Sequence, residues 1–331
     1  MKAVVLVGGF GTRLRPLTYT TPKPLLPVGH RPILELVLEN LATAGIEEAV
    51  LSLGFNPGAF TARYPERRCA GVRLDYAVEP EPLDTAGAIG FAARHAGIDE
   101  TFVVVNGDIL TDLDVGRLLA AHCATGAEGT IHLTPVEDPS GFGVVPTDAA
   151  GRVLAFIEKP PRDEAPTNLI NGGTYILEPS TLARIPTGRK VSIERETFPA
   201  MVADGALFAL ATDDYWTDTG RPDLYLAANL DAVAGRRRGV APQAIGDGAT
   251  VDGTVVDSVI GAGSTVAAGA LVTGSVLLPG VSIATGAEVV GSCLGAGVRV
   301  GAGARVVDSV LGDGEVVAEG TTVAAERRPP A

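Results

Sequence analysis

Residues 1–28 read MKAVVLVGGFGTRLRPLTYTTPKPLLPV, and they decide the first part of the fold. The apolar, β-branched run at 3–7 predicts a buried strand, and the three glycines Gly8, Gly9 and Gly11 follow it closely. Glycine lets backbone N–H groups come close to phosphate oxygens, so the stretch predicts a strand that ends in a phosphate-binding loop. For the glycines alone, an ordinary tight turn is the alternative.

The same segment is basic in an otherwise acidic chain. The 331 residues contain 26 Lys and Arg against 39 Asp and Glu, a formal net charge of −13, yet residues 1–34 contain no acidic residue. Their cations are Lys2, Arg13, Arg15, Lys23 and Arg31. Cations in and after a glycine loop suit a triphosphate whose pyrophosphate end must leave carrying negative charge, although a solvated basic surface is the alternative. The loop matches neither the P-loop pattern nor the dinucleotide fingerprint.

Length and composition indicate a folded protein of about two domains. Hydrophobic residues make up 46% of the chain, which is too many for a disordered protein, and no run reaches the ~18 apolar residues of a spanning helix. The three cysteines form no close pair, so neither a disulfide framework nor a zinc site is expected. An acidic chain is not expected to bind nucleic acid or an anionic membrane. The first apolar run is too short for a signal peptide, so we expect a cytoplasmic protein.

Strand-like and helix-like stretches alternate up to residue 235. Strands are expected at 3–7, 49–53, 102–105 and 174–177, and helices at 32–44, 85–96, 114–125 and 221–235. This alternation predicts an α/β fold, in which helices cover a mixed, mostly parallel, Rossmann-like sheet that binds ligands at the carboxyl ends of its strands. We expect a first domain over residues 1–235 and a polar, proline-containing linker over 236–243.

Residues 244–323 repeat with a period of 17. Aliphatic residues recur at Ile260, Leu277, Leu294 and Leu311, and serines at Ser258, Ser275, Ser292 and Ser309. Intermediate spacings of six, six and five residues predict a three-sided parallel β-helix with one short strand on each side. A disordered Gly/Ala-rich segment would not keep aliphatic residues in this register. The charged, proline-rich end at 324–331 is expected to be a disordered tail.

Two aspartates follow strand-like runs in different parts of the chain. Asp108 lies in NGD after Val105, and Asp218 lies in YWTDTG. Mg²⁺ in proteins commonly takes one or two carboxylates together with substrate phosphates, so the pair is a candidate magnesium site. Taken singly, each aspartate could equally be a helix cap or a turn residue.

Together these motifs resemble those of the sugar-1-phosphate nucleotidylyltransferase family. The matching stretches, in chain order, are GGFGTRLRPLTYTTPKPLLPV, VEPEPLDTAGA, VVNGDIL, PSGFGVV, FIEKP, NGGTYIL and YWTDTGRP. The C-terminal repeat resembles the left-handed hexapeptide β-helix of the branch that contains mannose-1-phosphate guanylyltransferases. The resemblance implies a catalytic domain over 1–235 and Mg²⁺-assisted transfer of a nucleotidyl group from GTP to mannose 1-phosphate. UDP-, dTDP- and ADP-glucose pyrophosphorylases are the alternatives.

The resemblance also implies roles for individual positions. The nucleotide and its phosphates would be bound by Gly8, Gly9, Gly11, Thr12 and Arg13. The base and ribose would be bordered by Glu79, Thr85, Ala86 and Gly87. The sugar phosphate would be bound by Gly143, Glu158, Lys159, Asn171 and Gly172. Mg²⁺ would be bound by Asp108 and Asp218, and the catalytic cations would be Arg13, Lys23 and Lys159.

Two departures from the family pattern concern the substrate pockets. Asp84 stands where relatives often have Gly, and it could accept hydrogen bonds from guanine or simply face solvent. Gly173 stands where Ala is usual, which would loosen the sugar pocket.

The same architecture is compatible with other functions. A regulatory subunit that senses sugar nucleotides is one alternative. An acyltransferase β-helix is disfavoured because no histidine follows His132 to act as a base. The remaining interpretation of the β-helix is an assembly or regulatory module, and assembly through it predicts a homo-oligomer.

Overall fold

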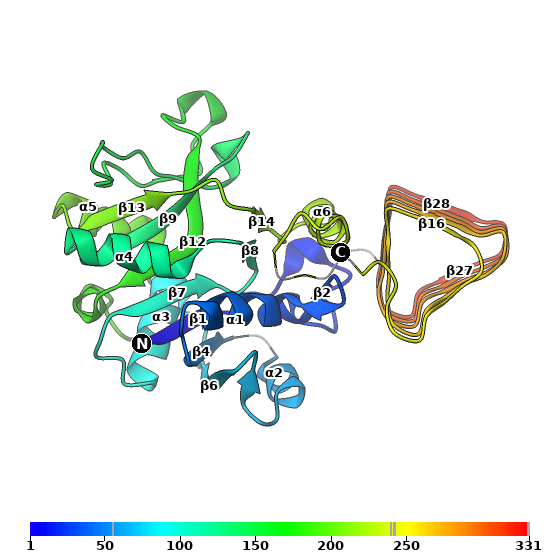
Figure 1. Ribbon diagram of the computed structural model, residues 1–331, viewed down its shortest axis with the longest axis horizontal. Helices are drawn as coiled ribbons and strands as arrows, with labels where there is room; N and C mark the ends of the chain where they lie inside the picture. Colours follow the sequence, from blue (N-terminus) through cyan, green and yellow to red (C-terminus); the bar gives the residue numbers. More distant parts are fainter. Residues whose placement is uncertain (55, 239, 241–242, 330–331) are drawn as a thin grey trace. The chain divides into compact units, whose positions relative to one another are not determined.

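The protein is represented by a computed structural model that describes residues 1–54, 56–238, 240 and 243–329 (Figure 1). The chain forms two compact units. The first contains Met1–Gly9 and Val37–Trp216, and the second contains Phe10–Leu36 and Thr217–Ala331. Within the described part of the chain, no helix combines the length and the apolar character that a membrane crossing requires. The predicted linker includes residues 239, 241 and 242, which lie outside the described residues.

A ten-stranded mixed sheet forms the first unit. Its parallel centre consists of β7 (Phe102–Asn106), β1 (Lys2–Leu6), β4 (Glu48–Leu53) and β6 (Val72–Val78). The other strands are β5 (Arg68–Cys69), β9 (Gly129–Pro135), β10 (Gly143–Val144), β11 (Ile157–Glu158), β12 (Leu169–Leu177) and β13 (Leu207–Ala211). β12 runs antiparallel to β7, β9 and β10. The predicted mixed sheet is confirmed, with its parallel strands at the centre.

Burial on both faces explains why the central strands are continuous apolar runs. Val4, Val50 and Val104 are at most 2% exposed and belong to one core cluster with the apolar residues of α3. The helices are α1 (Ile33–Thr43), α2 (Pro57–Arg63), α3 (Asp84–His95), α4 (Val115–Thr125), α5 (Phe198–Ala203) and α6 (Pro222–Val233). The four predicted helices correspond to α1, α3, α4 and α6.

The second unit begins with the segment that follows the first strand. This segment contains the short helices Thr12–Leu14 and Lys23–Leu25 and the strands β2 (Pro27–Val28) and β3 (Arg31–Pro32). Helix α6 anchors it, because the Tyr225 hydroxyl donates to the Pro27 carbonyl at 2.5 Å and the Gly29 N–H donates to Asn229 Oδ1 at 3.1 Å. The Tyr225 and Asn229 side chains are buried, so these bonds are shielded from water.

The C-terminal repeat is a left-handed parallel β-helix with three flat sides, which Figure 1 shows end on. One side contains β15 (Thr250–Val251), β18 (Thr265–Val266), β21 (Ser282–Ile283), β24 (Arg299–Val300) and β27 (Val316–Val317). The second contains β16 (Thr254–Val256), β19 (Leu271–Thr273), β22 (Glu288–Val290), β25 (Arg305–Val307) and β28 (Thr322–Ala324). The third contains β17 (Val259–Ile260), β20 (Val276–Leu277), β23 (Cys293–Leu294), β26 (Val310–Leu311) and β29 (Arg327–Arg328).

The predicted period of 17 is confirmed by the strand register. Ile260 pairs with Leu277, Leu277 with Leu294 and Leu294 with Leu311. All four residues are at most 1% exposed and form the inner column of one side. The first coil is shorter, since Val251 pairs with Val266, 15 residues later.

The prediction of a disordered tail is wrong for residues 324–329. Strand β29 pairs with β26, and the Val310 N–H donates to the Glu326 carbonyl at 2.8 Å while the Gly312 N–H donates to the Arg328 carbonyl at 2.7 Å. Composition suggested disorder, but the backbone groups of the previous coil provide a template for one more strand. Residues 330–331 of the predicted tail lie outside the described residues.

A buried column of serines connects the coils. Each serine hydroxyl donates to the carbonyl two residues before it and accepts from an N–H 17 residues later. The serines are at most 1% exposed. The column therefore satisfies backbone groups that the corner between two strands would otherwise leave without a partner.

We expect Ser292→Ala to lower the free energy of unfolding by about 1–3 kcal/mol, because the buried Ser309 N–H and Val290 carbonyl lose their partner. Chemical denaturation measures the change. Ser282→Ala is the matched control, since the Ser282 hydroxyl accepts only an exposed bond from Thr265. Equal stabilities of the two variants would contradict a structural role for the column.

Candidate functional site

The carboxyl ends of the central strands gather part of the candidate site within the first unit. Gly8 follows β1, Glu79 follows β6, and Gly107 and Asp108 follow β7. A Cβ added to Gly8 would lie 3.2 Å from the Gly54 nitrogen and 3.3 Å from Glu79 Oε1, so only glycine fits without a shift. At Gly9 an added Cβ would meet no atom within 4 Å. The first two loop glycines therefore combine one tightly packed backbone position with one open position.

Glu79 is engaged within the protein. Its Oε1 accepts from the Ser52 hydroxyl at 3.0 Å, and its Oε2 accepts from the Leu83 N–H at 3.0 Å. Glu79 thus fixes the turn that leads into α3. The bond to Leu83 makes it a positioning group for the residues that begin this helix.

The predicted base-binding residues at the start of α3 point mostly into the protein. The Thr85 hydroxyl donates to Glu194 Oε2 at 2.7 Å and accepts from the Ile193 N–H at 2.8 Å. Ala86 is 0% exposed and belongs to the hydrophobic core. At Gly87 an added Cβ would lie 2.9 Å from the Leu83 Cβ. The sequence did not reveal that Thr85 binds Ile193 and Glu194.

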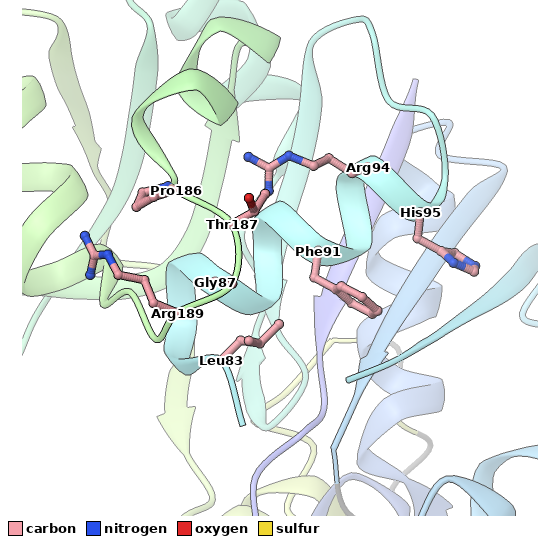
Figure 2. Close-up of a pocket in the computed structure, with 9 residues that line it drawn as sticks. Leu83, Gly87, Phe91, Arg94, His95, Pro186, Thr187 and Arg189 are labelled. Carbon is pink, nitrogen blue, oxygen red and sulfur yellow. The ribbon is translucent and has the colours of Figure 1, made fainter. Parts of the chain in front are cut away.

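A cavity of about 320 Å³ lies beside α3 (Figure 2). Figure 2 shows that α3 and the residue before it carry one part of the lining and that the loop 186–189 passes along the helix. The segment just before this loop is tied to α3, because the Arg94 guanidinium donates to the Leu182 and Ile185 carbonyls at 2.9 and 2.7 Å. The lining is mainly apolar, with Leu83, Phe91 and Pro186.

Asp84 adopts a backbone conformation that favours glycine. Its φ is 62°, in the left-handed region, and its carboxylate accepts from the Thr85 N–H at 2.8 Å. Asp is one of the few residues that tolerate this region by bonding locally. A glycine would suit this backbone position equally well, and Asp84 itself is exposed.

The position of Asp108 depends on the glycine before it, Gly107. A Cβ added to Gly107 would lie 2.5 Å from Val7 Cγ1, and the Gly107 N–H donates to the Leu6 carbonyl at 2.9 Å. The NGD turn can therefore press against the end of β1 only with glycine at its centre. Asp108 is partly exposed at this edge of the sheet.

Four of the predicted sugar-phosphate residues lie on three adjacent strands, and Lys159 directly follows one of them. Gly143 in β10 pairs directly with Glu158 in β11, and β10 also pairs with β12, which carries Asn171 and Gly172. Lys159 Nζ lies 3.1 Å from Glu158 Oε1. The Asn171 amide donates to the Tyr175 hydroxyl at 2.9 Å. The structure thus brings the five predicted residues to one part of the sheet.

Trp216 is a residue of this region that sequence reasoning missed. Its indole N–H donates to the Gly172 carbonyl at 2.9 Å, and its ring contacts Phe142 edge to face with centroids 5.6 Å apart. It is the one tryptophan of the chain and lies inside the YWTDTG motif, which was the available signal.

Glycines shape the turn within β12. A Cβ at Gly172 would lie 2.3 Å from His132 Nδ1, and Gly173 has a φ of 76° with an added Cβ 2.8 Å from Asn106. Alanine at 173 would therefore be strained here. Burial lowers the pKa of His132 to about 4, so this histidine is neutral and part of the packing.

In the second unit the rest of the glycine loop continues into a turn. Gly11 has a φ of 60°, and an added Cβ would lie 3.1 Å from Thr18 and 3.3 Å from Lys23. The Thr18 hydroxyl donates to the Gly11 carbonyl at 2.7 Å. Thr12 is exposed, and the buried Leu14 anchors the turn.

Asp218 brings two loop cations together. Lys23 Nζ lies 3.3 Å from Asp218 Oδ1, and Arg13 Nη2 lies 3.8 Å from Asp218 Oδ2. The Gly220 N–H donates to the same Oδ1 at 2.8 Å. The Lys23 and Asp218 side chains are only 7% and 15% exposed, whereas Arg13 is 66% exposed. The predicted cations and the predicted metal ligand of this unit thus form one cluster.

Two protein-family models match the chain, one over each of its two main parts. Residues 2–234 match the model of the nucleotidyl transferase family, and residues 241–329 match that of the GlmU-like C-terminal hexapeptide. The chain therefore belongs to the nucleotidyl transferase family. The predicted family and the predicted hexapeptide repeat are both confirmed.

Curated relatives of this nucleotidyl transferase are named for one reaction. A mannose-1-phosphate guanylyltransferase of Mycobacterium tuberculosis is 40% identical over 82% of this chain and 78% of its own length. Mannose-1-phosphate guanyltransferases of Hypocrea jecorina and Schizosaccharomyces pombe are 44% and 42% identical. These two alignments cover 69% and 72% of this chain and 63% and 66% of the relatives, which is less than two thirds of their length.

Solved structures show the same fold over about two thirds of the chain. HddC from Yersinia pseudotuberculosis is 29% identical with a TM-score of 0.60, over 69% of this chain and 97% of HddC. The complex of HddC with GMP-PN has a TM-score of 0.59 at 29% identity, over the same shares of the two chains.

The chemistry of Asp218 suits a divalent cation, which this family generally uses. Both carboxylate oxygens face cations, and a carboxylate has further lone pairs that a metal can use. Among the described residues no three His, Cys, Asp or Glu side chains cluster as a complete metal cage. A cation here would need phosphate oxygens as further ligands, as Mg²⁺ commonly does.

We expect Asp218→Asn to lower the free energy of unfolding of this nucleotidyl transferase by about 3 kcal/mol, because the buried Lys23 ammonium loses its counter-charge. Asp223→Asn, which breaks the exposed ion pair with Arg221, is the control and should cost less than about 1 kcal/mol. Chemical denaturation of both variants tests this. A loss at Asp218 no larger than at Asp223 would contradict the proposed anchoring.

We expect Asp84→Gly to leave nucleotide preference and stability nearly unchanged, whereas Asp84→Ala should destabilise by about 1 kcal/mol because of its left-handed backbone. Denaturation and a comparison of nucleoside triphosphates measure the two effects. A changed base preference in Asp84→Gly would show instead that the carboxylate contacts the base.

Proposed function

We propose that the protein transfers a nucleotidyl group from a nucleoside triphosphate to a hexose 1-phosphate, with GTP and mannose 1-phosphate as substrates. The observation that supports this most directly is the cluster in which Asp218 holds Lys23 and Arg13 beside the glycine loop. Such a pair of cations serves a reaction in which one anion attacks another. The names of the curated relatives support the choice of GTP and mannose 1-phosphate.

In the proposed reaction the sugar phosphate supplies the nucleophile. One of its oxygens attacks the α-phosphorus of the triphosphate, a P–O bond forms there, and the bond to the β-phosphate oxygen breaks to release pyrophosphate. No side chain forms a covalent bond, so no Ser, Cys or His nucleophile is needed. The protein lowers the barrier by neutralising charge and by holding the two anions in line.

The proposed roles of the residues follow from their chemistry. The backbone N–H groups of Gly8, Gly9, Gly11 and Thr12 bind the phosphates. Glu79, Thr85, Ala86 and Gly87 form the turn and the start of α3 that border the base and ribose, and the Ala86 side chain packs in the core behind that border. Arg13 and Lys23 neutralise the departing pyrophosphate. Lys159 binds the phosphate of the sugar, while Gly143, Glu158, Asn171 and Gly172 line the sugar itself.

Asp108 and Asp218 are the proposed ligands of Mg²⁺, which when bound screens the phosphate charges. Before the cation arrives, Asp218 is bound to Lys23 and Arg13. Lys23 and Arg13 would neutralise phosphate oxygens beside the cation that Asp108 and Asp218 would hold. Within this cluster the carboxylate therefore holds both cations near the glycine loop.

The cellular location, the oligomeric state and the domain boundaries are proposed from the sequence. A cytoplasmic location and a homo-oligomer formed through the β-helix stay predictions, as do the domain boundaries at residues 235 and 244. The β-helix sides offer aliphatic surface that a second copy could cover, including Val316, which is 56% exposed.

Pyrophosphate release tests the proposal. We expect the purified protein with Mg²⁺ to release pyrophosphate from GTP and mannose 1-phosphate faster than from UTP, dTTP or ATP with glucose 1-phosphate. A preference for one of these other pairs would change the assigned substrates but leave the proposed type of reaction in place. No release with any pair would contradict the enzyme and favour a subunit that senses sugar nucleotides.

Asp108→Asn should lower kcat at least ~100-fold, as expected for the loss of a key electrostatic contact in the transition state. Its stability should stay close to that of the wild type, because Asp108 is partly exposed. Asp99→Asn, which changes an exposed carboxylate in the same unit, is the control. Near-normal turnover of Asp108→Asn in saturating Mg²⁺ would contradict the metal assignment.

A further inference from the structure

The final strand of the β-helix contacts the glycine loop within the second unit. Arg327 in β29 extends its guanidinium to the turn that follows Gly11. Its Nη1 donates to the Arg13 carbonyl at 3.0 Å and to the Arg15 carbonyl at 3.3 Å. One cationic group of the C-terminal coil therefore bridges two carbonyls of the loop that carries Arg13.

These carbonyls have a structural reason to need a partner. Thr12–Leu14 is a single turn of 3₁₀-helix, and the carbonyls at the end of a short helix lack partners inside it. The two N–H groups of Nη1 are fixed in the plane of the guanidinium, so this one nitrogen holds both acceptors at a fixed separation, whereas a lysine ammonium rotates freely about its bond. Arg327 thus restricts the backbone on both sides of Leu14.

Two further contacts join the β-helix to the same segment. The Thr20 hydroxyl donates to Asp313 Oδ2 at 2.6 Å, and Asp313 Oδ1 accepts from the Ala296 N–H at 2.8 Å. A Cβ added to Gly312 would lie 3.1 Å from the Pro16 Cβ, so the two backbones are close. Three coil residues therefore contact the stretch between Arg13 and Thr20.

These contacts affect the position of a charged side chain, that of Arg13. Arg13 is 66% exposed, and its guanidinium lies 3.8 Å from the carboxylate of Asp218. A long exposed side chain of this kind is placed mainly by its backbone. The backbone of Arg13 is bonded to Arg327, so the C-terminal coil influences where the Arg13 side chain can reach.

We propose that Arg327 is a positioning residue for the triphosphate-binding loop. It acts through the Arg13 and Arg15 carbonyls and keeps the loop in the conformation that binds the nucleotide. The β-helix is then part of the nucleotide site as well as a module for assembly. This inference rests on the proposed function for its kinetic consequence, but the contact itself can be tested without it.

The kinetic test separates positioning from general stability. We expect Arg327→Gln to raise KM for the triphosphate roughly tenfold, corresponding to the loss of about 1.4 kcal/mol of binding, and to leave KM for the hexose 1-phosphate unchanged. Arg327→Lys should recover only part of the effect, because it restores the positive charge without the two N–H groups that the guanidinium fixes in one plane. Arg299→Gln removes an exposed positive charge from another β-helix strand and is the matched control.

The structural test uses backbone hydrogen exchange. We expect amides in the segment 14–19 to exchange faster in Arg327→Gln than in the wild type and in Arg299→Gln. This measurement needs no substrate. If the wild type released no pyrophosphate, the proposed function would fail while exchange would still test the contact.

Unchanged exchange together with an unchanged triphosphate KM in Arg327→Gln would overturn the proposal. An equal rise of KM for both substrates would also overturn it, because that result indicates a general loss of structure. Full recovery by Arg327→Lys would show that only charge matters and would exclude positioning through the two carbonyls.

Discussion

A single carboxylate organises the part of the protein on which the proposed chemistry depends. The Asp218 side chain is only 15% exposed. Its Oδ1 lies 3.3 Å from the Nζ of the buried Lys23, and its Oδ2 lies 3.8 Å from Nη2 of Arg13. Two cations would repel one another without it, and a buried ammonium without a counter-charge is costly. The pairing explains how an acidic chain keeps a basic loop folded until anionic substrates bind.

The β-helix and the turn that carries Arg13 belong to one compact unit. The link is made by polar groups at the last coils: Arg327 binds two loop carbonyls and Asp313 binds Thr20. Since the β-helix is a rigid stack with satisfied backbone groups, it is a firm support for a short turn. Support of this kind is what a phosphate-binding loop needs for preorganised binding.

The sequence predicted features that depend on local patterns. The aliphatic and serine repeats fixed the β-helix because each coil repeats the same contacts, and the alternation of runs fixed the strands and helices of the first unit. Asp84 shows a different case, since its left-handed backbone comes from the turn that Glu79 holds and no residue pattern reveals it. Contacts between distant segments, such as Thr85 with Glu194 and Arg327 with Arg13, were not predictable, because no spacing rule connects them. The ordered strand β29 was missed for the same reason.

The central claim is that Arg13, Lys23 and the glycine loop bind a nucleoside triphosphate. A crystal structure of the protein with Mg²⁺ and a non-hydrolysable GTP analogue tests it most directly. The account predicts that the β- and γ-phosphates contact the Arg13 and Lys23 side chains and the backbone N–H groups between Gly8 and Thr12. A nucleotide bound elsewhere, or phosphates turned away from both cations, would contradict it.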